Sequence, residues 1–266
     1  MQNIIGKILF VVIITIAALF IYKTIKVSSA KPVSVIITES KSVDKICEEE
    51  RVKEIIKEYL INSPEIIIQS IEGLQKRKIQ EKENKVNDYI KSNQIDIENI
   101  KSFPTLGNED GDITIVAFFD YNCSYCKKGD LFINQLLQND TNIKLLLRPL
   151  PILGNASQYL AQVALAVYKV NPSKFKVIHD GLMTIQDITK KSVEDLLSEN
   201  NLNVSEIEEV ADSKEIKALI EKNMEIAKNL KINGVPVYII NGRLIPGLID
   251  LVQLQTMVKD IRDNKK

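Results

Sequence analysis

The pattern of apolar and polar positions divides the chain into three parts, and the first part has the layout of an export segment. Residues 8–22 are uninterruptedly apolar and follow a short head that carries Lys7. This run resembles the core of a secretory signal and falls short of the roughly 18 to 20 residues that span a bilayer comfortably. The small residues at 28–30 offer a cleavage site. Residues 1–30 are therefore predicted to be a cleaved signal peptide or an uncleaved membrane anchor.

Residues 31–103 are predicted to form a linker and a helical arm. Apolar residues recur at the spacing of an amphipathic helix at Val52, Ile55, Ile56, Tyr59 and Leu60. Asn62-Ser63-Pro64-Glu65 then has the pattern of a helix cap with proline at the first helical position. Residues 75–85 are almost entirely polar, which is typical of a solvated spacer. The arm is expected either to pack on the main domain or to serve in oligomerisation, because its apolar stripe needs a partner surface.

Residues 104–266 have the pattern of an α/β domain. The apolar run 113–119 suits a strand that is buried on both faces, and a helix begins at the cysteines that follow. Residues 143–147 then make a second buried strand. A strand-helix-strand unit of this kind implies two parallel strands joined by a right-handed crossover.

An all-helical insert is predicted at about 156–231, where only helical signals occur. Pro172 restarts a helix within this stretch. After the insert, Asn241-Gly242 between two short apolar runs is a strong hairpin signal, and a closing helix is expected at 250–260. The candidate N-terminal caps in the insert are Ser192, Ser205 and Ser213.

Charge and composition exclude one class of function. The chain carries 35 basic and 35 acidic residues, so it lacks the basic field that a nucleic acid or an acidic substrate would need. Its three cysteines are too few for a disulfide-stapled scaffold. No nucleic-acid partner is expected, and the candidate chemistry concentrates in the C-x-x-C pair of FDYNCSYCKK, Cys123 and Cys126.

Three explanations compete for this pair. A zinc site needs four ligands, for which Cys47, Cys123, Cys126 and His179 would suffice in number. However, Cys47 lies alone in the arm, and a histidine in an ordinary helical stretch is more often a hydrogen-bonded structural residue. A permanent structural bridge would close too short a loop to constrain the unfolded chain. Redox exchange is the favoured explanation, and no metal or other cofactor is expected.

The position of the pair at the head of a helix supports redox exchange. A sulfur at the first turn faces unsatisfied N–H groups and the positive end of the helix dipole, which favours a thiolate. Cys123 takes this place, while Cys126 lies nearly one turn on and is turned inward. Lys127 and Lys128 add positive charge nearby. Cys126 is then close enough to close a disulfide or to resolve a mixed one.

These segments together resemble the DsbA branch of the thioredoxin superfamily over roughly residues 104–263. The matching features are the strand before CSYC, the helical insert, GVPVYI, and the closing hairpin and helix. The resemblance implies a thioredoxin-like α/β fold with Cys123 as nucleophile, Cys126 as resolving cysteine and Pro236 as a cis-proline. Val235 would then offer its backbone to an extended client segment. The residues expected to modulate the site are Asp120, Ser124 and Tyr125.

Two departures from that family pattern affect the expected activity. Ala117 stands where thioredoxin-like proteins often carry a buried carboxylate, and Tyr125 stands where DsbA has a histidine. A milder oxidant than DsbA is therefore expected. Val235 before Pro236 favours an oxidase by resemblance, because isomerases often have threonine at that place.

The arm resembles a narrower group. VKEIIKEYLINSPEIIIQSIEGLQ, residues 52–75, is similar to the N-terminal region of ScsC-type and related alphaproteobacterial DsbA-like proteins. That resemblance implies an arm that mediates trimerisation and trimers that can act as disulfide isomerases. Cys47 is interpreted as a small hydrophobic residue of the arm, with an inter-subunit disulfide or a regulatory thiol as alternatives.

The sequence thus predicts an exported thiol-disulfide oxidoreductase that forms disulfide bonds in reduced or unfolded client proteins. Its reoxidising partner, by family analogy, is a membrane quinone-linked protein. A periplasmic location is expected because the chemistry needs an oxidising space, although positive-inside counting of the lysines around residues 8–22 opposes this orientation. The alternatives are an oligomeric isomerase or reductase, and a membrane-tethered holdase with a vestigial redox site.

Overall fold

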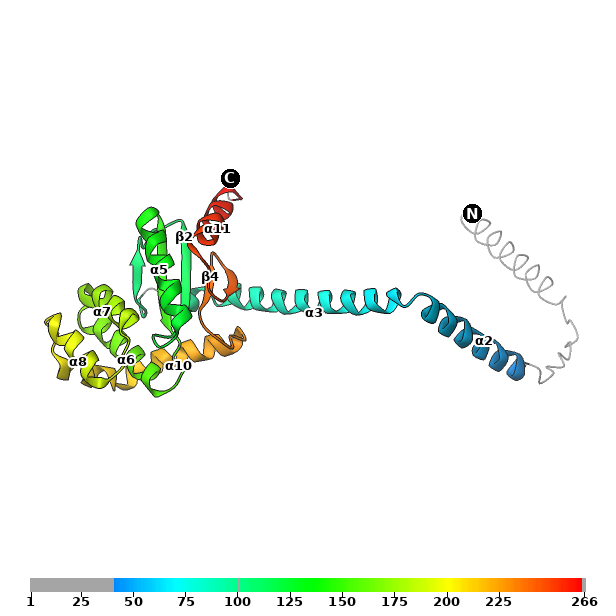
Figure 1. Cartoon of the computed structure of the whole chain (residues 1–266), viewed down its shortest axis with the longest axis horizontal. Coiled ribbons are helices and arrows are strands. Elements are labelled where there is room, and N and C mark those ends of the chain that lie inside the picture. The colour runs from blue at the N-terminus through cyan, green and yellow to red at the C-terminus, as the bar shows by residue number, and fades with distance from the viewer. Residues whose placement is uncertain (1–40, 100, 265–266) are drawn as a thin grey trace, which may run out of the picture. The chain divides into compact units, whose positions relative to one another are not determined.

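The computed structural model describes residues 41–99 and 101–264 (Figure 1). The predicted export segment, residues 1–30, lies outside these ranges. Within them, no helix combines the length and the apolar character that crossing a membrane requires. The chain divides into two compact units, Met1–Ile71 and Glu72–Lys266.

The described part of the first unit is helical. It contains α2 (Lys41–Asn62) and the first turns of α3 (Glu65–Ser92). The break between the helices falls at Ser63 and Pro64, as the cap pattern predicts. Four residues of the predicted stripe are largely exposed in the single chain: Val52, Ile55, Ile56 and Tyr59. The apolar side chains of Ile67 and Ile71, at the start of α3, are exposed as well.

The second unit is built on a five-stranded sheet of order β1-β3-β2-β4-β5. The strands are β1 (Thr105–Gly107), β2 (Ile113–Phe119), β3 (Ile143–Pro149), β4 (Val237–Ile240) and β5 (Arg243–Pro246). β2 and β3 are parallel and joined through α5 (Ser124–Asn139), which confirms the predicted strand-helix-strand unit. The other pairs are antiparallel. The short strand β1 was not predicted, because a three-residue strand before turn residues has no periodicity to detect.

β2 is apolar at nearly every position because both faces of the sheet are covered. Ile115 and Ala117 belong to a core that includes α5 and α11 (Leu251–Asp263). Val116 and Phe118 belong to a core on the other face, with α10 (Lys214–Asn229) and the end of α3. The strand therefore lies between two helical layers.

The second unit begins well before the expected boundary at residue 104. Ile90 of α3 and Ile97 of α4 (Gln94–Ile97) are buried in the same core as Val116 and Phe118. Residues 75–85 are exposed, as the polar spacer predicts. The apolar stretch after that spacer is short, which is why its packing on the sheet was not apparent from the sequence.

The predicted insert is all-helical and consists of α6 (Asn155–Val170), α7 (Pro172–Thr184), α8 (Lys190–Glu199), α9 (Val204–Ala211) and α10. Ser213 caps α10, as predicted. The predicted caps Ser192 and Ser205 are wrong. Thr189 caps α8, with Ser192 as its capping-box partner, and the amide oxygen of Asn203 caps α9.

The C-terminal hairpin and helix complete the sheet and one of its layers. Asn241 and Gly242 both adopt positive φ angles, of 48° and 84°, which suits a tight two-residue turn between β4 and β5. Asp250 caps α11 through a hydrogen bond from the N–H of Gln253. Leu254 and Val258 of α11 are buried in the core that contains the cysteines.

Candidate redox site

Cys123 is the N-cap residue of α5 and lies just beyond the end of β2. Its backbone is extended, with φ −90° and ψ 118°, and its sulfur accepts a hydrogen bond from the N–H of Cys126 at 3.4 Å. The sulfur thus lies at the end of a helix where unpaired N–H groups best stabilise negative charge. The predicted placement of Cys123 at the head of the helix is confirmed.

Cys126 lies behind Cys123 and is turned into the core. Its exposed fraction is 1%, against 7% for Cys123. Burial raises the pKa of the Cys126 thiol well above its ordinary range, although a hydrogen bond from the N–H of Asp120 to its sulfur, at 3.5 Å, acts in the opposite direction. Cys126 is therefore the more deeply buried member of the pair.

The chain returns to the cysteines at the start of β4. The Val235–Pro236 peptide bond is cis, as the family resemblance implied. The Cys123 thiol donates to the carbonyl oxygen of Val235 at 3.6 Å. The carbonyl oxygen of Pro236 accepts a hydrogen bond from Gly247 at 2.9 Å, which ties this segment to the end of the hairpin.

Asp120 organises the loops around the cysteines. Its carboxylate is buried and accepts hydrogen bonds from the N–H groups of Asn122, Ile152 and Leu153, at 2.8, 2.9 and 3.0 Å. The carboxylate therefore holds the loop after β3 beside the loop that leads to Cys123. Asp120 lies directly after β2, as predicted.

The two residues between the cysteines are exposed. Ser124 is the first residue of α5. Tyr125 is 60% exposed, and the Lys128 ammonium lies 6.0 Å from the centroid of its ring. The Lys127 ammonium donates to the carbonyl oxygen of Ile185 at the end of α7. Burial also lowers the pKa of Lys127.

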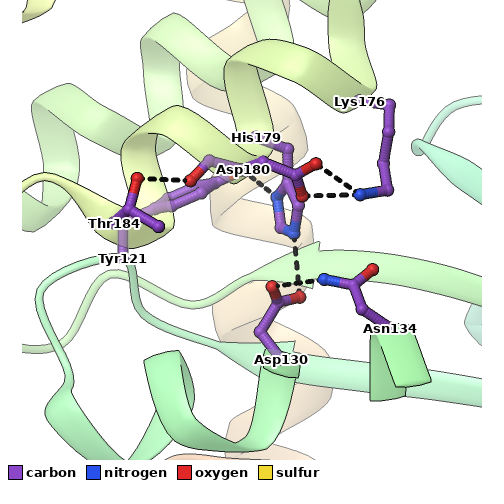
Figure 2. Close-up of polar contacts among 7 residues, drawn as sticks. All are labelled: Tyr121, Asp130, Asn134, Lys176, His179, Asp180 and Thr184. Atoms are coloured by element: carbon purple, nitrogen blue, oxygen red, sulfur yellow. Dashed lines mark hydrogen bonds and ion pairs between the residues drawn. The ribbon is translucent and has the colours of Figure 1, made fainter. Parts of the chain in front are cut away.

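A buried hydrogen-bonded chain beside the cysteines was not predicted. The Tyr121 hydroxyl lies 2.9 Å from Nδ1 of His179, and Nε2 of His179 lies 3.1 Å from the Asp130 carboxylate (Figure 2). Asn134 donates to the other oxygen of that carboxylate at 2.8 Å. Asp130 follows Cys126 by one helical turn on the inward face of α5, a spacing that the sequence does show.

His179 is a hydrogen-bonded buried residue, as predicted. Within the described residues, its possible ligand atoms group with those of Asp130 and Asp180, within 4.8 Å of one another, and not with Cys123 or Cys126. Both ring nitrogens have partners in Tyr121 and Asp130, and the Lys176 ammonium pairs with Asp180. The geometry is that of a satisfied polar cluster.

Tyr238 is a further residue near the cysteines that the sequence did not single out. It faces Ala117 directly in the antiparallel pair of β2 and β4, in the core that contains both cysteines. Its ring lies so close to α5 that a Cβ added at Gly129 would approach the phenol oxygen to 2.3 Å. Burial, and then the nearby Cys126 and Asp130, raise the pKa of Tyr238.

Two family models match the chain. The model of the DSBA-like thioredoxin domain matches residues 114–259, and the model of the copper resistance protein ScsC N-terminal domain matches residues 48–81. The first range contains the cysteines, the insert and the cis-proline segment. The second lies in the helical arm.

Known proteins show the same similarity. A thioredoxin-like oxidoreductase from Silicibacter pomeroyi is 32% identical, with a TM-score of 0.61 over 64% of this chain and 98% of that one. Proteus mirabilis ScsC in a transitional conformation is 26% identical, with a TM-score of 0.60 over 81% of this chain and 97% of that one. Disulfide bond formation protein D of Bacillus subtilis is 25% identical over 175 residues, which cover 61% of this chain and 79% of that protein. The chain therefore belongs to the DSBA-like thioredoxin domain family and is a thiol-disulfide oxidoreductase.

Proposed function

We propose that the chain forms disulfide bonds in client proteins through a disulfide between Cys123 and Cys126. The observation that carries the proposal is the unequal burial of two cysteines at one helix N-terminus, with Cys126 deeper in the core and the Cys123 sulfur next to the Val235 carbonyl. A client thiolate attacks Cys123, and Cys126 leaves as a thiolate that then takes up a proton. A second client thiolate attacks the client sulfur of the mixed disulfide and releases Cys123 as a thiolate with the oxidised client.

The surroundings of Cys123 suit an extended, unfolded client. The backbone of Val235 lies beside the sulfur, where a client strand can pair with it. Tyr125 and Leu153 are 60% and 50% exposed, and Asp120 fixes the backbone of Leu153 close to the cysteines. Apolar contacts of this kind favour unfolded chains over folded ones.

The remaining parts of the proposal concern the cell. Disulfide donation requires an oxidising compartment, so the apolar run at 8–22 is proposed to direct export to the periplasm. Each turnover leaves two thiols, and a membrane quinone-linked partner is proposed as their electron acceptor.

The test uses the oxidised protein and a reduced, unfolded client that contains two cysteines. Client oxidation is expected to be lost in Cys123→Ala. The Cys126→Ala variant is mixed with a client whose cysteine is activated as a disulfide with a small thiol. Cys123 is expected to attack this disulfide, release the small thiol and form a mixed disulfide with the client that accumulates. Cys47→Ala is the matched control and is expected to behave as wild type. Client oxidation that persists in Cys123→Ala contradicts the proposal.

An oligomeric disulfide isomerase is the second candidate, and the arm favours it. Residues 48–81 match the ScsC N-terminal model, and the apolar side chains of α2 and of the start of α3 are exposed in the single chain. These side chains are proposed to pack against other copies. The mass of the protein in solution, with residues 52–75 present and deleted, tests this. An oligomer that becomes a monomer on deletion supports it, and a monomer in both cases contradicts it.

A further inference from the structure

The geometry points to His179 as a positioning residue that fixes the redox pair from the helical insert. We infer that its imidazole clamps the two segments on either side of the cysteines and so favours the reduced form. The inference rests on the proposed redox role of Cys123 and Cys126. It assigns a part in the reaction to the insert helix α7, which contributes no sulfur.

The clamp consists of Tyr121, His179 and Asp130, and it joins residues on either side of the cysteine pair. Tyr121 lies two positions before Cys123, and Asp130 lies four positions after Cys126. Both side chains contact the same imidazole, at 2.9 Å through Nδ1 and at 3.1 Å through Nε2, as Figure 2 shows. The segment that carries both sulfurs is thereby held at its two ends by one ring.

The hydrogen bonds are satisfied by a neutral imidazole. In the tautomer that carries its proton on Nε2, the imidazole donates to the Asp130 carboxylate and accepts from the Tyr121 hydroxyl at Nδ1. Asn134 holds the second oxygen of that carboxylate, so Asp130 is itself fixed in place. All three members of the clamp are at least nine-tenths buried, where a missing partner is costly.

Aromatic packing fixes the ring in addition. Phe175 of α7 stacks on His179 at 5.5 Å between centroids, and Phe119 at the end of β2 meets it edge-on at 5.6 Å. A phenylalanine at position 179 can keep these contacts and lose both hydrogen bonds. His179→Phe is therefore a substitution that separates the clamp from the packing of the core.

The clamp affects the equilibrium between the disulfide and the two thiols through the position of Cys123. As the N-cap residue, Cys123 keeps its sulfur against the N–H of Cys126 only while the loop before it and the helix after it hold their relative position. That contact stabilises the open, reduced pair. When the clamp is lost, the reduced form loses this support, and the equilibrium moves toward the disulfide.

The experiment measures the equilibrium constant for reduction of the Cys123–Cys126 disulfide by glutathione in the full-length protein. His179→Phe and Tyr121→Phe are each expected to lower this constant, by at least threefold for His179→Phe. The double variant is expected to be no lower than His179→Phe alone, since both changes break the same unit.

Two controls separate positioning from general loss of stability. Tyr159→Phe removes a hydroxyl that has no hydrogen-bond partner among the described residues. Ile216→Ala opens a cavity in a separate core cluster, formed by α6, α10 and Phe103. Both variants are expected to keep the wild-type constant.

The outcomes distinguish the clamp from the function on which it rests. The clamp is overturned if His179→Phe and Tyr121→Phe both keep the wild-type equilibrium constant for reduction. It is also overturned if Ile216→Ala lowers that constant as much as the clamp variants do. A wild-type protein whose cysteines form no disulfide in any glutathione buffer overturns the proposed function, and the clamp with it. A shift confined to the two clamp variants supports the inference.

Discussion

The N–H of Cys126 donates to the sulfur of Cys123 across the first turn of α5, at 3.4 Å. The same turn therefore carries both the more accessible sulfur and the group that stabilises charge on it. The sulfur of Cys126, deeper in the core, accepts a hydrogen bond from the N–H of Asp120 at 3.5 Å. The two cysteines therefore differ in burial and in the groups around their sulfurs, and they are expected to differ in reactivity.

Cys123 is expected to react with iodoacetamide at least tenfold faster than Cys126 in the reduced protein at pH 7. Cys126 is almost fully buried, and its pKa is raised, so little of it is a thiolate at that pH. Mass mapping of the labelled cysteines after short exposure measures both rates. Equal rates contradict the assigned order of the two sulfurs, and urea-unfolded protein is the control in which the rates converge.

The reduced protein is expected to lose stability as the pH rises above about 9. The Cys126 thiol has a higher pKa in the folded chain than its ordinary value of 9.0, so the unfolded state releases its proton first. The stabilisation that it contributes is complete below the unfolded pKa and is lost as the pH rises toward the folded one. Urea unfolding at pH 7 and pH 10 measures the loss, which should be smaller in Cys126→Ala. An equal loss in the variant contradicts the assignment to Cys126.

Asp120→Ala is expected to destabilise the chain by about 2 to 4 kcal/mol and to slow client oxidation. Three backbone N–H groups lose their acceptor, and the loop with Leu153 loses its attachment beside the cysteines. Urea unfolding and the client assay measure the two effects. Asp88→Ala, on an exposed face of α3, is the control and is expected to change stability by less than about 0.5 kcal/mol. An Asp120→Ala variant as stable as this control would show that the carboxylate does not hold the loop.

Gly129→Ala is expected to destabilise the chain by about 1 to 3 kcal/mol, although alanine forms helices better than glycine by about 1 kcal/mol. The added Cβ would lie 2.3 Å from the Tyr238 hydroxyl oxygen, closer than any real contact. In a Tyr238→Phe background the same change is expected to cost less, because the colliding oxygen is absent. Gly73→Ala in α3 is the control, because the new methyl would meet the Arg77 guanidinium at 3.8 Å, an ordinary van der Waals contact, and it is expected to stabilise slightly. Equal effects of Gly129→Ala in both backgrounds would contradict this account of the packing.

The sequence predicted those parts of the fold that local patterns determine. Signals within a few residues predict the strands at 113–119 and 143–147, the Asn241-Gly242 turn and the head of α5 at Cys123. The burial of Ile90 and Ile97 against β2 depends on contacts with distant segments, which no local pattern reports.

The same distinction applies to the site. Asp130 shares the inward face of α5 with Cys126, so its burial follows from helical spacing. Its partner His179 comes from α7, and the Tyr121 hydroxyl that completes the chain is 58 positions away from that histidine. Such contacts depend on how the insert packs on the sheet, and a single sequence does not show that packing.

Donation of the Cys123–Cys126 disulfide to clients is the proposed function. Its most direct test is the reduction potential of this pair, measured by equilibrating the protein with glutathione buffers, quenching with acid and counting the free thiols by mass. A potential well above that of the glutathione couple is expected, because the disulfide would then be the less stable form and would readily oxidise client thiols. A potential well below that couple would mean a stable disulfide and would contradict the donor role.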